Sequence, residues 1–518
     1  MQRIRFLVVV CCLLSARAGL AQQRAEDPTF DILEYRVEGN SILTKLAVER
    51  AVYPHLGEKR RIADVEKARA SLEKAYRDAG YATVVVNVPV QKVDKGVVVL
   101  QVIEGRIERV RITGSRYYSQ GSILAGVPAA SPNEVPYFPD VQRQVDRLNS
   151  ADRRVTPVLR PGTAPGTTEL ELNVRDDLPL HGSLEVNDRY SPNTTPYRLT
   201  AGLRYDNLFQ RDHSIGLQYQ TSPQDTSEVK ALLVTYAVPV STGSVYGYYV
   251  NSDSNVAAVS SVTVLGNGQI AGLRRAWYVP GNSAFTSAFT AGVDYKNFDQ
   301  VVTQAGTPGL RTPVHYLPFS LDYSGSLQGK SATTTFSVAT EFSFRGVGNN
   351  ADDFANDRFK ASPNFFIFRW DFVGTLNLPA SLVLVSRFDG QLGDQPLISN
   401  EQYFAGGLMN VRGYLEAEAL GDRAVHGSVE LRSPNFSGNS ESLQDLRMIG
   451  FFEGARLWII DPLPEQQQRF SLASAGIGLR ARAANTLELW VNVAIPLVSS
   501  TYTTAHHART QFSAIYKF

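Results

Sequence analysis

Two charged residues in the carboxy-terminal part of the chain have the chemistry of an ion pair. The first belongs to a motif of four residues, Val411, Arg412, Gly413 and Tyr414. Gly413 allows a tight backbone turn, so that Arg412 projects from the tip of a hairpin. The second is Glu453, whose strand-like alternation places it on one face with Phe451 and Ala455. A guanidinium and a carboxylate pair in two-point geometry, so this pair would hold a loop against a wall. A four-residue motif alone leaves open that Arg412 is a solvated loop residue.

No other combination of side chains points to catalysis or to a cofactor. His506 and His507 are adjacent, but no third metal ligand lies nearby. Gly476 and Gly478 lie in a strand pattern, and no helix follows that would build a phosphate site. No nucleophile, base and acid occur together at a catalytic spacing. We therefore expect a protein that is not an enzyme and that binds neither a metal nor a cofactor.

The amino-terminus has the features of a secretory signal peptide. Arg3 and Arg5 precede a short apolar run, and small residues lead up to a cleavage position after Ala21. We predict that residues 1–21 form the signal peptide and residues 22–28 a short linker. The run is too short to span a bilayer as a helix, and no later apolar stretch reaches the roughly 18 residues that such a helix needs.

Cysteine content and charge narrow the possible partners. Cys11 and Cys12 both lie inside the apolar run, so the mature chain would have no disulfide and no thiolate metal site. A lipoprotein signal cleaved at Cys11 is the alternative, but it would leave too little apolar core. The chain has 51 basic and 50 acidic residues, which gives no argument for a nucleic-acid partner.

The last residues of the chain alternate as a strand of an outer-membrane barrel does. One parity holds Phe512, Ala514, Tyr516 and Phe518. The other parity holds Gln511, Ser513 and Lys517. Such a strand shows lipid-compatible groups on one side and polar groups on the other, and we expect its aromatic residues to act as the barrel-assembly signal. A half-buried strand of a soluble sheet is the alternative.

From Leu180 onward the whole sequence follows this pattern. We predict sixteen strands, near residues 181–188, 197–206, 214–221, 227–238, 243–251, 269–279, 284–296, 315–324, 331–345, 364–376, 381–392, 424–433, 446–458, 471–482, 486–497 and 509–518. One face of these strands carries Arg, Glu and Asn, so it cannot be a dry core, but it can line a water-filled lumen. Short and long connections alternate, as barrels with short periplasmic turns and long outer loops require. Residues 179–518 would thus form a barrel that admits an extended peptide but no folded domain.

Two small domains precede the predicted barrel. Residues 29–105 have the order β-α-α-β-β, and residues 106–178 repeat it. An exposed sheet edge in either copy could add an incoming chain as a further strand, which suits a receptor for an unfolded client. The alternative is that both copies are spacers without a binding role.

Together, the signal peptide, the paired β-α-α-β-β units, the barrel, the motif at 411–414 and the aromatic terminus resemble the two-partner secretion transporters. These form the TpsB-type branch of the Omp85 superfamily, like the outer-membrane proteins that export hemolysins and hemagglutinins. The resemblance implies that the front units are POTRA domains and that the long loop, residues 393–423, folds into the lumen. It also implies that Arg412 contacts the acid of a strand motif, which falls on Glu453 with Phe451 and Ala455.

The chain departs from this family in three places. The acid is Glu453 where the family has Asp, so we expect the contact to be displaced or bridged by water. Ala455 stands where the family has Gly. Only residues 22–29 separate the predicted cleavage site from the first strand, so we expect no plug helix and closure by the long loop alone.

The resemblance implies a mainly β outer-membrane translocator with its POTRA domains in the periplasm. Its partners would be a large secreted exoprotein as client, outer-membrane lipids, and the barrel assembly machinery during biogenesis. Two alternatives remain open: an Omp85-type assembly factor, whose members usually carry three or more POTRA units, and a passive solute channel.

Overall fold

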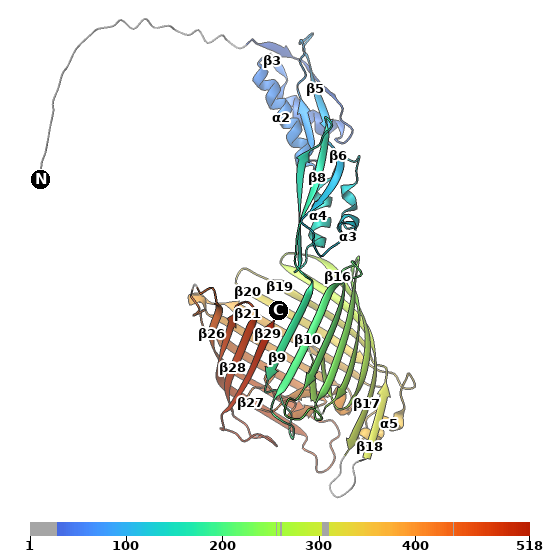
Figure 1. Cartoon of the computed structure of the whole chain (residues 1–518), viewed down its shortest axis with the longest axis vertical. Coiled ribbons are helices and arrows are strands. Elements are labelled where there is room, and N and C mark those ends of the chain that lie inside the picture. Colours follow the sequence, from blue (N-terminus) through green and yellow to red (C-terminus); the bar gives the residue numbers. More distant parts are fainter. Residues whose placement is uncertain (1–27, 255, 260–261, 303–309, 439) are drawn as a thin grey trace, which may run out of the picture. The chain divides into compact units, whose positions relative to one another are not determined.

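The computed structural model describes residues 28–518 apart from 255, 260–261, 303–309 and 439. The predicted signal peptide, and the predicted linker up to residue 27, therefore lie outside the described residues. The chain divides into two compact units between Asp177 and Leu178 (Figure 1). In the described part of the chain, no helix is long and apolar enough to cross a membrane.

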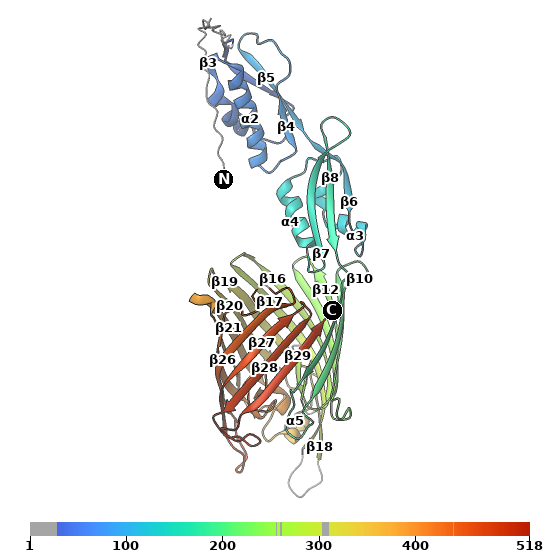
Figure 2. The same cartoon turned by 60° about the vertical axis from the view of Figure 1, so that its left-hand side comes forward.

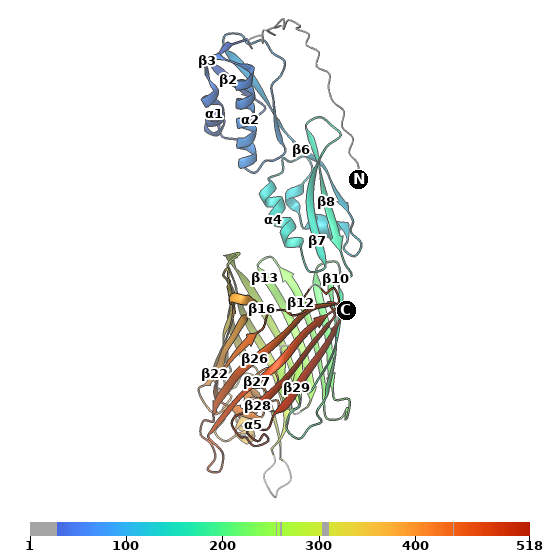
Figure 3. The ribbon, with the colours of Figure 1, turned by 90° about the vertical axis from the view of Figure 1, so that its left-hand side faces the viewer.

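The amino-terminal unit begins with a module of two helices and a three-stranded sheet. Its elements are β1 (Phe30–Ile32), β2 (Glu34–Glu38), α1 (Lys45–Val52), η1 (Tyr53–His55), β3 (Gly57–Arg60), α2 (Ile62–Asp78), β4 (Val84–Asn87) and β5 (Val97–Glu104). In the sheet, β5 lies between a parallel β2 and an antiparallel β4, while β1 and β3 form a separate pair. Figure 3 shows α1 and α2 side by side in this module.

A second module repeats the order. Its elements are β6 (Arg106–Thr113), α3 (Gln120–Ala125), η2 (Pro128–Ala130), α4 (Phe138–Leu148), β7 (Arg153–Pro161) and β8 (Thr167–Asp176). The central strand β8 lies between a parallel β6 and an antiparallel β7, which is the arrangement of the first module. The order β-α-α-β-β expected from the sequence therefore holds for the helices and the three-stranded sheet of both modules, and the first module adds the pair β1 and β3.

Helix α2 shows how the sequence builds these modules. Its buried residues Val65, Ala68, Leu72 and Tyr76 recur every three or four positions and pack against the sheet. Ala68, Leu72 and Tyr76 are completely buried. The helix ends before Gly80, which has a φ of 94°, a backbone conformation that glycine adopts at little cost.

The carboxy-terminal unit is a closed antiparallel barrel. Its wall strands are β9 (Leu180–Asn187), β10 (Arg198–Leu208), β11 (His213–Thr221), β12 (Lys230–Val240), β13 (Gly243–Asp253), β16 (Gly268–Asn282), β17 (Phe285–Val302), β18 (Leu310–Tyr316), β19 (Phe319–Gln328), β20 (Ala332–Phe342), β21 (Phe366–Asn377), β22 (Val383–Gly393), β25 (Arg423–Arg432), β26 (Leu443–Trp458), β27 (Arg469–Ala483), β28 (Leu487–Pro496) and β29 (Arg509–Lys517). Figure 2 shows β26 to β29 as tilted neighbours, and β29 closes the wall by pairing with β9.

The described barrel has sixteen wall positions, as the sequence predicts. Strands β18 and β19 follow one another along the same edge of β17, so together they fill one position. The sequence pattern indicated a single strand at 315–324, but Pro318 lies between the two, where its missing N–H interrupts the ladder. A small hairpin of β14 (Val256–Val259) and β15 (Val262–Leu265) extends the connection after β13.

The two faces of the wall differ as the alternation predicts. On β11, Ile215, Leu217 and Tyr219 are 40, 50 and 41% exposed, which places them on the outer surface. Gln220, of opposite parity, is buried and donates to Thr200 Oγ1 at 3.2 Å inside the barrel. An apolar outer band and a polar interior are the pattern of a barrel that faces lipid.

A charged residue on the outer face is expected to destabilise the barrel. Leu217→Arg places a guanidinium near the middle of β11 on the apolar band, and we expect a cost of about 2–4 kcal/mol. Gln218→Arg, one residue along on the inner face, is the matched control and should cost less than about 1 kcal/mol. Urea unfolding of both variants in lipid vesicles measures the difference; equal costs would contradict the assignment of the two faces.

Candidate functional site: the loop inside the barrel

The connection between β22 and β25 is long and folds against the inner wall. It contains η4 (Ser399–Glu401) and a small pair of strands, β23 (Tyr403–Ala405) and β24 (Ala419–Gly421). Although they belong to a loop, Val411 and Tyr414 are completely buried. They form one apolar cluster with wall residues of β25, β26 and β27, namely Ala424, Ala455, Leu457 and Leu472. The loop is therefore a packed part of the barrel interior.

Arg412 and Glu453 are in direct contact. Arg412 donates from Nε to Glu453 Oε1 at 3.1 Å and from Nη2 to Oε2 at 3.1 Å, which is two-point geometry. The backbone N–H of Arg412 also donates to Oε1. Both residues are buried, at 7 and 2% exposed. The expectation that the longer glutamate would displace the contact or require a bridging water is wrong, because Glu453 reaches the guanidinium directly.

The neighbours of Arg412 in the motif fix the turn. Gly413 has a φ of 89°, and a Cβ there would lie 3.1 Å from the Cβ of Ala494, so the turn and the close approach both favour glycine. The Gly413 N–H donates to Gln511 Oε1 at 2.7 Å. The Tyr414 hydroxyl lies 2.7 Å from the carbonyl oxygen of Val498, to which it donates. The turn is thus held by β29 and by the segment that follows β28.

Phe451 and Ala455 lie on the same inner face as Glu453, as parity predicts. The guanidinium of Arg412 stacks on the Phe451 ring, with Cζ 3.5 Å from the ring centre, which is a favourable cation–π contact. The ring lies over Gly476 of β27, where a Cβ would come within 2.4 Å of it. Gly476, which the sequence pattern showed only as a strand glycine, therefore makes room for this stack.

Sequence reasoning missed a second acid and an amide at the same site. Arg412 Nη1 donates to Glu430 Oε2 at 3.0 Å and to Asn492 Oδ1 at 3.4 Å. Glu430 also accepts from Arg432 at 2.7 Å and lies 3.6 Å from Arg480. A cavity of about 320 Å³ adjoins these side chains. Strand alternation could have shown that Glu430 and Asn492 point inward. It does not show which strands lie next to the loop tip, so it could not assign these residues to the site.

A second loop shares the interior with the first. The connection between β20 and β21 contains α5 (Ala351–Asp357), whose Phe354 packs with Leu397 and Ile398 of the long loop. Arg358 donates to both oxygens of Asp422, at 2.6 and 2.8 Å. The expectation of closure by the long loop alone is therefore incomplete, because a second loop packs against it. The sequence of residues 343–365 gave no sign of this contact.

The aromatic residues at the end of the chain lie on the outer side of β29. The Phe512 ring lies 6.2 Å from the ring of Tyr197, and Tyr516 and Phe518 are 46 and 60% exposed. A Cβ at Gly182 would lie 2.0 Å from the Phe518 ring, so this glycine makes room for the terminal side chain beside the closing pair of strands.

Removing the acid of the buried pair is expected to destabilise the barrel interior. Glu453→Gln removes one of the two carboxylates that pair with the buried Arg412 guanidinium and leaves Glu430 as the other, and we expect a loss of about 3 kcal/mol in unfolding free energy. Glu488→Gln, which removes the acid of the more exposed pair with Lys517, should cost less than about 1 kcal/mol. Urea titration of the detergent-purified protein compares the two; a cost for Glu453→Gln as small as that of the control would show that the pair adds little.

Comparisons with known proteins agree with this architecture. The family model described as haemolysin secretion/activation protein ShlB/FhaC/HecB matches residues 166–481, and the model described as POTRA domain, ShlB-type, matches residues 30–105. An outer membrane transporter CdiB of Dickeya dadantii (strain 3937) is 21% identical over 429 residues, which are 79% of this chain and 74% of that protein.

Solved structures show the same fold. CdiB from Escherichia coli has a TM-score of 0.63 at 17% identity, over 98% of this chain and 93% of that one. BamA from Haemophilus ducreyi lacking POTRA domains 1–3 has a TM-score of 0.59 at 13% identity, over 95% of this chain and 100% of that one. Because the first family model spans more than half of the sequence, the chain belongs to the haemolysin secretion/activation protein family ShlB/FhaC/HecB and is an outer-membrane transporter with amino-terminal POTRA domains in the periplasm.

Proposed function

We propose that the protein exports an unfolded polypeptide, a large secreted exoprotein, from the periplasm to the cell surface through its barrel. The observation that carries this proposal is the loop tip at Arg412, which is held inside the barrel by polar contacts to Glu453, Glu430 and Gln511. Polar contacts exchange readily for contacts with water or with another chain. The tip also buries Val411 and Tyr414 against the wall, so a passing chain must replace these apolar contacts as well. The loop is thus a closure that a passing chain can displace.

The second POTRA module, residues 106–178, has one sheet edge that is closed to a new strand. Alternate residues of an edge strand point their backbone N–H and C=O groups away from the sheet. On β7 the outward N–H of Val155 already donates to Asn149 Oδ1 at 2.6 Å, and the outward C=O of Arg153 accepts from Ser150. Two further outward positions are Pro157 and Pro161, which have no N–H.

The opposite edge, β6, is open over its second half. The outward groups of Ile107 are bonded by the backbone of Asn133 and Glu134. Beyond the irregularity after Ile107, pairing with β8 leaves the outward N–H and C=O groups of Val110 and Ile112 without a hydrogen bond to the rest of the described chain. We therefore assign client binding to β6, by addition of an extended strand.

Export then needs no nucleotide at this membrane. A client strand pairs with β6, enters the barrel as the loop tip yields, and folds outside. Folding on the far side would supply the driving free energy, because a folded product does not fit back into a barrel of this size. The proposal includes no catalytic step, no metal and no cofactor.

Two other functions predict different behaviour. An assembly factor for other barrel proteins would change the outer-membrane protein content of the cell when it is deleted; the likeness to BamA shows the fold alone. A passive solute channel would conduct small solutes and leave no exoprotein dependent on it. As further partners we propose outer-membrane lipids at the exposed band and the barrel assembly machinery, which would read Phe512, Tyr516 and Phe518 during biogenesis.

Arg412→Ala is expected to block export while the barrel still assembles. The substitution removes the guanidinium that positions the loop tip and leaves the strand pairing of the wall intact. Secretion of a co-expressed exoprotein is followed by immunoblotting of culture supernatants, and assembly by the change in gel mobility on boiling. Normal secretion by an assembled Arg412→Ala barrel would show that the pair of Arg412 and Glu453 is not needed for export.

Val110→Pro is expected to reduce export by about tenfold, since one lost backbone hydrogen bond to the client is worth about 0.5–1.5 kcal/mol. Leu159→Pro is the matched control: it lies on the closed β7 edge between two existing prolines, and both side chains are partly buried in the same core. Pull-down of an unfolded client with the full-length variants gives the binding loss directly. Equal effects of the two prolines would exclude β6 as the selective edge.

A further inference from the structure

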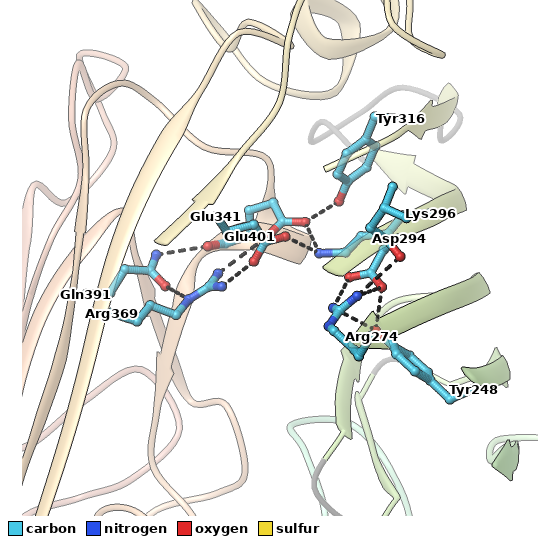
Figure 4. A network of polar contacts seen from close by, with 10 residues as sticks. Tyr248, Arg274, Asp294, Lys296, Tyr316, Glu341, Arg369, Gln391 and Glu401 are labelled. Carbon is cyan, nitrogen blue, oxygen red and sulfur yellow. Dashed lines mark hydrogen bonds and ion pairs between the residues drawn. The ribbon is translucent and has the colours of Figure 1, made fainter. Parts of the chain in front are cut away.

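A buried cluster of charges joins the start of the long loop to wall strands β17 to β21, which are not the strands that contact Arg412. Figure 4 shows Glu401 of the loop beside Lys296 of β17, Tyr316 of β18 and Arg369 of β21. Lys296 Nζ donates to Glu401 Oε1 at 2.6 Å, and the Tyr316 hydroxyl donates to the same oxygen. Arg369 Nη2 lies 3.5 Å from Glu401 Oε2. Glu401 is 1% exposed and Tyr316 is completely buried.

The wall by itself has one positive charge too many at this place. Lys296 donates to Glu341 of β20 at 2.7 Å, and Arg369 also donates to Glu341, so two cations share one wall carboxylate. The neighbouring Arg274 and Asp294 do not correct the balance, because they form their own two-point pair at 2.6 and 2.6 Å. Glu401 therefore supplies the missing negative charge from the loop.

The loop presents Glu401 through a short and separate attachment. Gln391 Nε2 of β22 donates to the backbone carbonyl of Glu401 at 2.9 Å, and the turn η4 sets the side chain toward the wall. The neighbouring Leu397 and Ile398 pack in the apolar cluster with Phe354. None of these contacts involves Arg412 or Glu453, so the start and the tip of the loop are held by separate sets of contacts.

We propose that Lys296, Tyr316 and Arg369 form a carboxylate-binding site in the wall of the barrel, which Glu401 fills while the loop is in place. When the loop is displaced, the site is left with an unpaired positive charge that faces the lumen, and this charge attracts a carboxylate with which it can form charge-assisted hydrogen bonds. Acidic side chains of the passing polypeptide then take the place of Glu401. The loop residue is thus an internal substitute for a client carboxylate, and binding of the client holds the loop in its displaced state.

This inference rests on the proposed function only for the source of the carboxylate. The site itself is tested with purified full-length protein in planar bilayers, using peptides of ten glutamates, ten glutamines or ten lysines, and free glutamate. Glu401→Gln removes the negative charge of the loop from the site without changing the wall strands. We expect block by the glutamate peptide at a concentration about tenfold or more below that needed for the wild type, because one charge-assisted hydrogen bond is worth about 1.5–3 kcal/mol.

Three double variants separate the site from a general effect of opening the barrel. Lys296→Gln with Glu401→Gln leaves Arg369 paired with Glu341 and should lose the block. Lys360→Gln with Glu401→Gln removes an exposed loop cation, paired with Asp461, and should keep it. Lys296→Glu with Glu401→Lys restores a neutral set and should return the resting conductance and weak block of the wild type, which a loss of packing alone would not do.

The outcomes are decisive in both directions. Block of Glu401→Gln by the glutamate peptide no stronger than by the glutamine peptide would overturn the site, as would unchanged block after Lys296→Gln. Equal block by free glutamate at the same carboxylate concentration would assign the site to small anions and overturn its role in export. If Glu401→Gln barrels fail to assemble, judged by gel mobility on boiling, the charge-swapped variant carries the test. If a co-expressed exoprotein is exported but the glutamate peptide does not block the Glu401→Gln barrel, this inference is wrong and the proposed function is unaffected.

Discussion

Lipid offers no hydrogen-bond partner to a backbone N–H or C=O group, and this constraint governs the carboxy-terminal unit. A sheet of any width keeps two unpaired edges unless its first and last strands meet. Here β29 pairs with β9 over Ser513–Lys517 and Asn187–Ser183, and the terminal Phe518 adds two backbone bonds with Gly182. Every other feature of the interior follows from the need to keep this ring closed.

Closure creates an interior that cannot be filled with apolar side chains alone, because the inner face of a barrel of this size is wide. The chain fills it by returning two loops, and polar inner residues such as Glu453 and Lys296 then lose water. Each needs a partner of opposite charge. The long loop supplies Arg412 for Glu453 and Glu401 for Lys296. Loop position and charge balance are therefore coupled: moving a loop leaves wall charges unpaired, so displacement is favourable only when water or another polar chain replaces what the loop supplied.

The fold could be predicted far more completely than the interior. A period of two in side-chain polarity defines a membrane strand over eight or more residues, so sixteen wall positions were found with ends correct to a few residues. The break at Pro318 was not predicted. Polar and apolar residues alternate on both sides of this proline, so the pattern looks like one continuous strand. Arg412 and Glu453 were paired through the resemblance to a known family. Glu430, Gln511 and Glu401 were not, because parity shows that a side chain points inward but not which of the other inward side chains it meets.

The prolines of β7 have a consequence for how many molecules one module can hold. A three-stranded sheet with two open edges could bind one extended chain at each edge. It could also pair edge to edge with other sheets and so grow into a larger assembly. With Pro157, Pro161 and Asn149 occupying one side, the second module can only terminate such a ladder. A module that binds a client through β6, as proposed, would therefore take up a single extended segment and would not link it to a second one.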